Sequence, residues 1–171
     1  SYGATYGDLL KDIVTLPTGI EGTWSIEDFD TLTVGNAGTR TFKAVFTPAN
    51  NNYNGREVTI TIEVAKATVP TPEVTHKGQI EYTGGKVASG IVSTDLYTAT
   101  DIGGVVVGKH SVQLVLKDKS NYMWSSTNKS DDIAIEYVEI IKAQNRDTIP
   151  AYTAIYGQQL SDITINISST T

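Results

Sequence analysis

An internal repeat constrains this chain more than any other feature. Residues 4–13 read ATYGDLLKDI, and residues 154–163 read AIYGQQLSDI, at a constant spacing of 150 residues from Ala4 to Ala154. The alanine, the tyrosine, the glycine, one leucine, one aspartate and the isoleucine keep their places. Self-similarity at a fixed spacing is the sequence signature of tandem arrays. The sequence therefore predicts consecutive modules of one kind.

The composition favours strands over helices. Apolar residues make up 39% of the chain and charged residues 19%, which suits a globular protein. Threonine, glycine, valine and isoleucine are abundant, and they favour pleated strands joined by tight turns. No stretch carries the apolar spacing of a long amphipathic helix. We therefore expect an all-β fold.

Two stretches in the first third alternate between apolar and polar residues. Residues 58–64 and 41–46 both have period 2, which predicts half-buried strands. Residues 35–38 are rich in glycine and asparagine and predict a turn that feeds the strand at 41–46. After this strand, residues 48–52 predict a loop, and we expect the ring of Tyr53 to return to the core.

Residues 108–141 repeat this layout. Apolar residues alternate at 112–116 and predict a strand. A loop is expected at 118–121, and a last strand is expected at 133–141. Within 133–141 the apolar residues change parity after Tyr137. This change predicts a β-bulge near Glu136, because an inserted residue lets both ends of the strand face the core.

These patterns divide the chain into a first β-rich module at 1–66, a second at 67–143, and a linker with the truncated start of a third module at 144–171. The linkers at 67–72 and 144–150 contain proline, which predicts stiff joints and a rod. A segment of about 20 residues buries too little surface to fold alone. We therefore expect residues 151–171 to lie as a strand against the preceding unit or a neighbouring molecule.

Five short phrases of the sequence are distinctive when taken together. In the first unit they are Tyr6-Gly7-Asp8 with Leu10, then residues 34–39, then Asn52-Tyr53-Asn54. In the second unit they are residues 81–86 and 117–125. These phrases resemble the bacterial Ig-like repeats of MBG type found in tandem on large surface proteins. The resemblance covers nearly the whole chain, and its phrases carry no catalytic meaning.

The resemblance implies an all-β protein of two tandem small antiparallel Ig-like β-sandwich modules plus the truncated start of a third. It also implies an extracellular location at a bacterial cell surface or cell wall. Modules of this family act as stalks, spacers or adhesive surfaces, and their first partners are the neighbouring repeat modules of the same chain.

The charge and the apolar pattern exclude several partners. The formal net charge is −6 and no basic stripe is present, so we expect no nucleic-acid partner. No apolar run approaches the ~20 residues that cross a bilayer, so we expect no membrane insertion in this fragment. The acidic clusters at 27–30 and 131–132 lack the spacing of a calcium loop, so we expect neither a metal nor a cofactor.

Catalysis is also disfavoured. The chain has no cysteine, and only His76 and His110 could serve as an imidazole base. No serine lies in a nucleophile pattern, and no third group is placed to orient either ring. Lys43 lies on the side of its strand opposite to Phe42, Ala44 and Phe46 and should face solvent, which disfavours an internal amide crosslink. The chain is therefore expected not to be an enzyme.

Three aromatic residues could form a ligand platform: Trp24, Tyr122 and Trp124. Tyr122 and Trp124 would share a face if residues 122–124 are extended. Large aromatic side chains in small sandwiches mostly fill the core, and this interpretation is preferred over a platform.

Two classes of function stay open at this point. The favoured one is a non-catalytic extracellular stalk, spacer or adhesin segment of a bacterial cell-surface protein. The alternative is a carbohydrate- or protein-binding module of a surface-anchored enzyme, whose partner would be a host glycan or protein.

Overall fold

The computed structural model describes every residue except 1, 19–20, 76, 148, 167 and 169–171. Residues 2–65 form the first body, a four-stranded sheet in the order β1-β4-β3-β2 with one helical turn. Its elements are β1 (Tyr2–Thr5), α1 (Leu10–Ile13), β2 (Gly22–Ser25), β3 (Gly38–Pro48) and β4 (Arg56–Ala65).

Residues 67–141 form the second body, which has two sheets. One is four-stranded in the order β6-β10-β8-β7, and the other pairs β5 with β9. The strands are β5 (Ala67–Val69), β6 (Gln79–Glu81), β7 (Tyr97–Thr100), β8 (Gly108–Leu116), β9 (Tyr122–Trp124) and β10 (Ile133–Ile141). Besides α1, the described residues contain one further helical turn, η1 (Leu160–Asp162). The expected all-β class is confirmed.

The sheets are mixed, which corrects the expectation of purely antiparallel modules. β1 runs parallel to β4, β6 runs parallel to β10, and β5 runs parallel to β9. A parallel neighbour needs a crossover connection, because a hairpin always reverses the strand direction. The chain between β5 and β6 instead leads from the two-stranded sheet to the four-stranded sheet.

The predicted strands at 41–46, 58–64 and 133–141 and the predicted bulge are confirmed. Lys43 is exposed on β3 and pairs with Glu57 at 3.3 Å, as its parity predicts. On β10 the register with β8 shifts between Glu136 and Val138. The extra residue is Tyr137, which is fully buried, as is Val138 beside it. The bulge therefore turns two consecutive side chains toward the core.

Each body has its own apolar core. The core of the first body lies between the sheet and the residues around α1, and its fully buried members are Leu10, Val34 and Ile62. The second body has two clusters. One cluster contains Trp124 of β9 and Val69 of β5. The other contains Tyr137 of β10 and lies toward the opposite end of the four-stranded sheet. No buried residue belongs to the clusters of both bodies among the described residues.

The two bodies repeat one strand pattern. β3 begins at Gly38, which pairs with Val64, and β8 begins at Gly108, which pairs with Ile140. Both glycines have positive φ, +108° and +135°, a conformation that side chains disfavour. In both four-stranded sheets the earliest strand, β1 or β6, lies parallel on the other side of the same long strand, β4 or β10.

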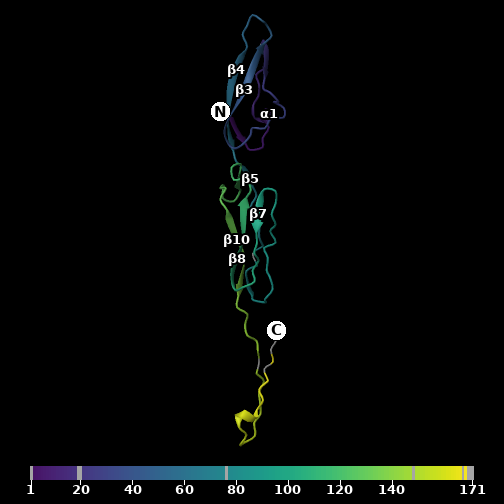
Figure 1. The fold of residues 1–171 in the computed structure, drawn as a ribbon, viewed down its shortest axis with the longest axis vertical. Helices are drawn as coiled ribbons and strands as arrows, with labels where there is room; N and C mark the ends of the chain where they lie inside the picture. The colour runs from purple at the N-terminus through teal and green to yellow at the C-terminus, as the bar shows by residue number, and fades with distance from the viewer. Residues whose placement is uncertain (1, 19–20, 76, 148, 167, 169–171) are drawn as a thin grey trace.

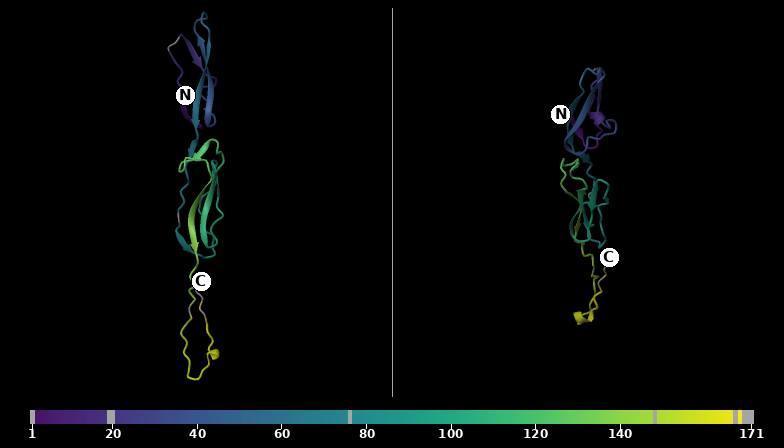
Figure 2. Two further views of the ribbon diagram at one scale, coloured as in Figure 1. Left: turned by 90° about the vertical axis from the view of Figure 1, so that its left-hand side faces the viewer. Right: turned by 45° about the horizontal axis from the view of Figure 1, so that its top comes forward.

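The bodies stack end to end, and the C-terminal segment continues from the second body (Figures 1 and 2). The joint between them is Lys66, which separates β4 from β5. The stretch 67–72, expected as a linker, instead supplies β5, and its Val69 is 1% exposed. The expected linker is therefore part of the second body, because its valine completes that core.

The predicted strand does not occur among the described residues between 142 and 166 of the C-terminal segment. The segment leaves the second body and turns back on itself at its far end (Figures 1 and 2). β10, which leads into the segment, already pairs with β6 on one side and β8 on the other. The strand that ends there therefore offers no free edge. Pairing with a neighbouring molecule stays a prediction.

The repeated segment keeps its local structure without its core. Gly7 and Gly157 both have positive φ, +97° and +89°, and a helical turn follows each of them. Leu10 is fully buried in the first body, whereas Leu160 is 75% exposed. The turn therefore forms without a surrounding core, and Ile155, Tyr156 and Leu160 stay exposed.

Candidate functional site

Asn121 of the second body forms the centre of the junction between the two bodies. Its Oδ1 accepts a hydrogen bond of 2.9 Å from the backbone N–H of Ala37, and its Nδ2 donates to Oδ1 of Asn36 at 3.2 Å. The same Nδ2 donates to Oδ2 of Asp118 at 2.8 Å, and the backbone oxygen accepts from Ala67 at 2.9 Å. Asn121 is 6% exposed. A buried polar side chain with every group paired fixes one geometry.

Asp118 orients Asn121 within the loop that precedes β9. The hydrogen bond from the side chain of Asn121 lowers the pKa of the Asp118 carboxyl, and burial opposes this effect. The backbone N–H groups of Asn121 and Ser120, together with the charge of Lys66, lower this pKa further. Asp118 therefore stays ionised at neutral pH and accepts these hydrogen bonds.

Two more contacts close the junction. The rings of Tyr6 and Tyr122 meet edge to face, with centroids 5.3 Å apart and planes at 79°. Lys66 donates from Nζ to the backbone oxygen of Lys119 at 2.6 Å and to Oγ of Ser130 at 2.9 Å. The joint residue is therefore itself bonded to the second body. These contacts oppose bending at Lys66.

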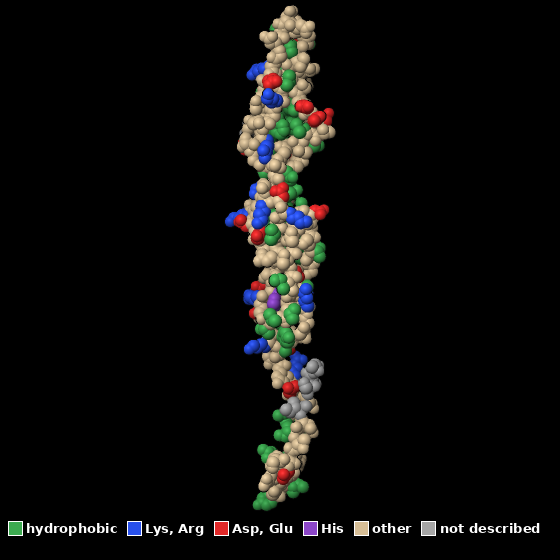
Figure 3. Space-filling view, viewed as in Figure 1, with side chains coloured by type: hydrophobic (Ala, Val, Ile, Leu, Met, Phe, Trp, Pro, Cys, Tyr) green, Lys and Arg blue, Asp and Glu red, His purple; other side chains and the backbone are tan. Residues whose placement is uncertain are grey.

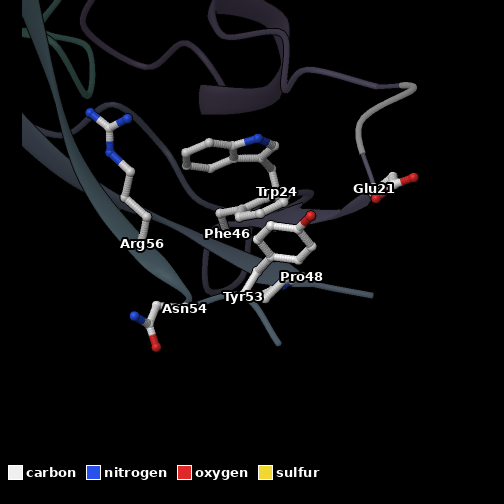
Figure 4. A pocket seen from close by; sticks show the side chains of 7 residues that line it. All are labelled: Glu21, Trp24, Phe46, Pro48, Tyr53, Asn54 and Arg56. Carbon is white, nitrogen blue, oxygen red and sulfur yellow. The ribbon is translucent and has the colours of Figure 1, made fainter. Parts of the chain in front are cut away.

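An aromatic hollow lies at the far end of the first body, away from the junction. It has a volume of about 410 Å³. Figure 4 shows its lining side chains, which are Glu21, Trp24, Phe46, Pro48, Tyr53, Asn54 and Arg56. The rings of Trp24 and Phe46 lie 5.3 Å apart, and the ring of Phe46 lies over Gly22, where a Cβ would collide with it. The hollow combines three aromatic rings with side chains of both charges.

Trp24 forms part of the hollow, but the other two predicted platform residues lie elsewhere. Trp124 is fully buried in the core of the second body, where its Nε1 donates to the backbone oxygen of Asp131 at 2.9 Å. Tyr122 faces Tyr6 at the junction. The structure therefore does not bring the three residues to one surface.

The ring of Tyr53 does not return to the core as expected. It is 63% exposed and lies on the rim of the hollow. Tyr53 lies in the loop that connects β3, which ends at Pro48, to β4, which begins at Arg56. This loop holds the ring beyond the end of the sheet. Sequence reasoning missed the hollow because its lining comes from β2 and from both sides of the β3–β4 turn. The signal was the spacing of Phe46 and Tyr53 around Pro48, which is also typical of ordinary turns.

The indole nitrogen of Trp24 differs from that of Trp124. Nε1 of Trp24 is buried, and no described residue accepts a hydrogen bond from it. An unpaired buried donor of this kind destabilises a fold by about 1–3 kcal/mol. Trp24 is therefore less well adapted to its surroundings than Trp124, although both lie near the end of a sheet.

Asp101 is the most strongly perturbed acid in the chain. Burial raises the pKa of its carboxyl, but hydrogen bonds from Ser89, Gly103 and Tyr137 outweigh this effect and lower the pKa to about 2. Oδ2 accepts from N and Oγ of Ser89, each at 2.6 Å. Oδ1 accepts from the N–H of Gly103 at 2.8 Å and lies 3.0 Å from the hydroxyl of Tyr137. A carboxylate held this way is a weak base, and it braces two loops against β10.

The remaining site candidates lie apart from one another. Nε2 of His110 contacts the backbone oxygen of Val106 at 2.8 Å, as Nε of Arg40 contacts that of Asn36 in the first body. His76 lies outside the described residues. Asp28 and Asp131 are exposed, and no group of three potential metal ligands occurs in the described part of the chain.

The charged side chains of both signs alternate over the face shown in Figure 3. None of the described helices has the length and apolar character needed to cross a bilayer. No model of a known protein family matches this chain, and no curated protein matches it.

Proposed function

We propose that this chain is a non-catalytic spacer segment, a stalk or part of an adhesin that holds other parts of its protein at a distance. The observation that supports this proposal is the hydrogen-bonded junction. The side chain of Asn121 bonds Ala37 and Asn36 of the other body and is only 6% exposed. A flexible joint would leave such a side chain solvated. Stiffness at the joint is what a spacer requires.

The proposed location is extracellular, at a bacterial cell surface or wall. This part of the proposal follows from the resemblance to the tandem MBG-type modules. The internal repeat supports it, because Gly157 and η1 restart the fold of the first body after the second has ended. In this proposal residues 144–171 open a third Ig-like module, and neighbouring modules are the first partners.

Small-angle X-ray scattering on the chain tests the spacer role. We expect the pair-distance distribution of a stiff elongated particle. A short Gly-Ser insertion after Lys66 separates β4 from β5, and we expect it to broaden this distribution because Asn121 then loses Ala37. A scattering curve of freely jointed bodies for the unaltered chain would contradict the proposal.

A second candidate function is binding of a carbohydrate or a protein, as in a binding module of a surface enzyme. The aromatic hollow favours it, because Trp24, Phe46 and Tyr53 offer three rings beside polar groups. Ligand sites combine apolar walls with a few polar groups in this way. A screen of soluble oligosaccharides and peptides against the chain, followed through the resonance of the Trp24 indole, tests it. The absence of any shift of this resonance with both oligosaccharides and peptides would count against binding.

A further inference from the structure

We propose that the aromatic hollow of the first body binds an extended peptide segment, which places an apolar side chain between Trp24 and Tyr53. The inference goes beyond the spacer role and does not depend on it, because the hollow is lined by residues around the turn that follows β3, whereas the junction lies at Ala37, before β3 begins. The supporting observation is that residues at corresponding positions of the two sheets differ in burial.

Those positions are set by the sheet registers. Trp24 on β2 pairs with Phe46 on β3, and Tyr97 on β7 pairs with Leu116 on β8. Each pair lies at the same end of its sheet, on the side of the core. Tyr97 and Leu116 are 9% and 2% exposed, whereas Trp24 and Phe46 are only half-buried. The same place is therefore covered in the second body and open in the first.

The cover in the second body is the two-stranded sheet. Val69 on β5 and Trp124 on β9 are register partners, 1% and 0% exposed, and they share a cluster with Tyr97 and Leu116. The ring of Trp124 lies 5.5 Å from that of Tyr97. The first body has no such sheet among its described residues. The hollow of about 410 Å³ therefore takes the place of Val69 and Trp124.

The occupant is a peptide strand, because a strand edge borders the hollow. β2 carries Trp24 and, in the described part of the chain, pairs on one side only, with β3. An extended segment added to such an edge satisfies its backbone groups and turns alternate side chains to one face. One of these side chains then enters the hollow, as Val69 enters the core of the second body. The opposite charges of Glu21 and Arg56 on the rim give no preference for a charged anchor.

The experiment titrates two short peptides into the ¹⁵N-labelled whole chain. One has the sequence of residues 66–71 with valine as the anchor, and the other that of residues 121–126 with tryptophan as the anchor. We expect saturable shifts of the Trp24 indole N–H and of the β2 amides in both titrations. Replacing the valine of the first peptide by aspartate (V69D) is expected to weaken binding at least about tenfold.

A matched pair of protein variants locates the site. Tyr53→Ser removes an exposed ring from the rim and is expected to weaken peptide binding without lowering Tm. Tyr82→Ser removes a ring of 43% exposure from the second body and should leave binding unchanged. Shifts with neither peptide, shifts at Trp124 instead of Trp24, or shifts with oligosaccharides alone would each overturn the inference.

Discussion

Oδ1 of Asn121 accepts a hydrogen bond of 2.9 Å from the backbone N–H of Ala37, a residue of the other body and 84 positions away in sequence. The two residues convert a one-residue joint into a bonded interface. The side chain of Asn121 holds Asp118 in its own loop at the same time. A substitution of Asn121 therefore removes hydrogen bonds on both sides of the joint.

Asn121→Ala is expected to destabilise the chain. The substitution leaves the N–H of Ala37 and the carboxylate of Asp118 without their partner, which costs about 1–3 kcal/mol. Urea unfolding measures the loss as a lower midpoint. Asn52→Ala, on an exposed loop, is the matched control and should change the midpoint little. Equal midpoints for the two variants would contradict the role of Asn121.

The contact between Tyr6 and Tyr122 is expected to contribute coupling energy across the joint. Aromatic pairs of edge-to-face geometry contribute about 0.5–1.5 kcal/mol beyond area burial. A double-mutant cycle of Tyr6→Ala and Tyr122→Ala, read by urea unfolding, measures this coupling. Additive effects of the two substitutions would show that the rings do not stabilise the junction.

Asp101 is expected to make stability depend on acid pH. The pKa of its carboxyl in the folded chain, about 2, lies below the ordinary value of 3.8, so the folded state favours the ionised form. Its stabilising effect is complete above about pH 5 and is lost as the pH falls from 3.8 to 2. Asp101→Asn should therefore cost about 1.5–3 kcal/mol at pH 7 and progressively less toward pH 2.

Urea unfolding of both forms at several pH values checks this dependence. Glu63→Gln, on the exposed side of β4, serves as the control for a surface carboxylate. A difference between wild type and Asp101→Asn that stays constant from pH 7 to pH 2 would refute the assignment.

The two tryptophans are expected to respond differently to truncation. Trp124→Phe removes a hydrogen bond to Asp131 and leaves space in a closed core, so we expect a loss of about 2–4 kcal/mol. Trp24→Phe removes an indole nitrogen that has no described partner, so we expect a loss below about 1 kcal/mol. Thermal unfolding of the two variants decides between a core role and a surface role for each ring. A larger loss for Trp24 would reverse our interpretation.

The strands at 41–46, 58–64 and 133–141 were predictable from the sequence because an alternating apolar pattern is a local feature. The strict alternation at 58–64 and 41–46 specifies one buried face, and the structure buries Ala44, Ile62 and Val64 on it. The parity change after Tyr137 specified the bulge for the same reason. The same alternation also predicted that the side chain of Lys43 points toward solvent.

The functional surfaces were not predictable in this way, because each depends on a partner far along the chain. Asn121 looks like any loop asparagine until the fold places Ala37 against it. The hollow arises because the first body lacks the strand pair that covers the second, and no residue pattern encodes a missing cover. Residues 67–69 were expected as linker because Pro70 follows them, yet burial of Val69 decided their place.

Stiffness of the joint is the central claim, and a distance distribution between the two bodies tests it most directly. The chain has no cysteine, so spin labels at Thr59→Cys on β4 and Gln113→Cys on β8, both exposed, report one distance by double electron–electron resonance. We predict a single narrow distribution that broadens when Asn121→Ala is added. A broad distribution in the chain with Asn121 intact would contradict the claim.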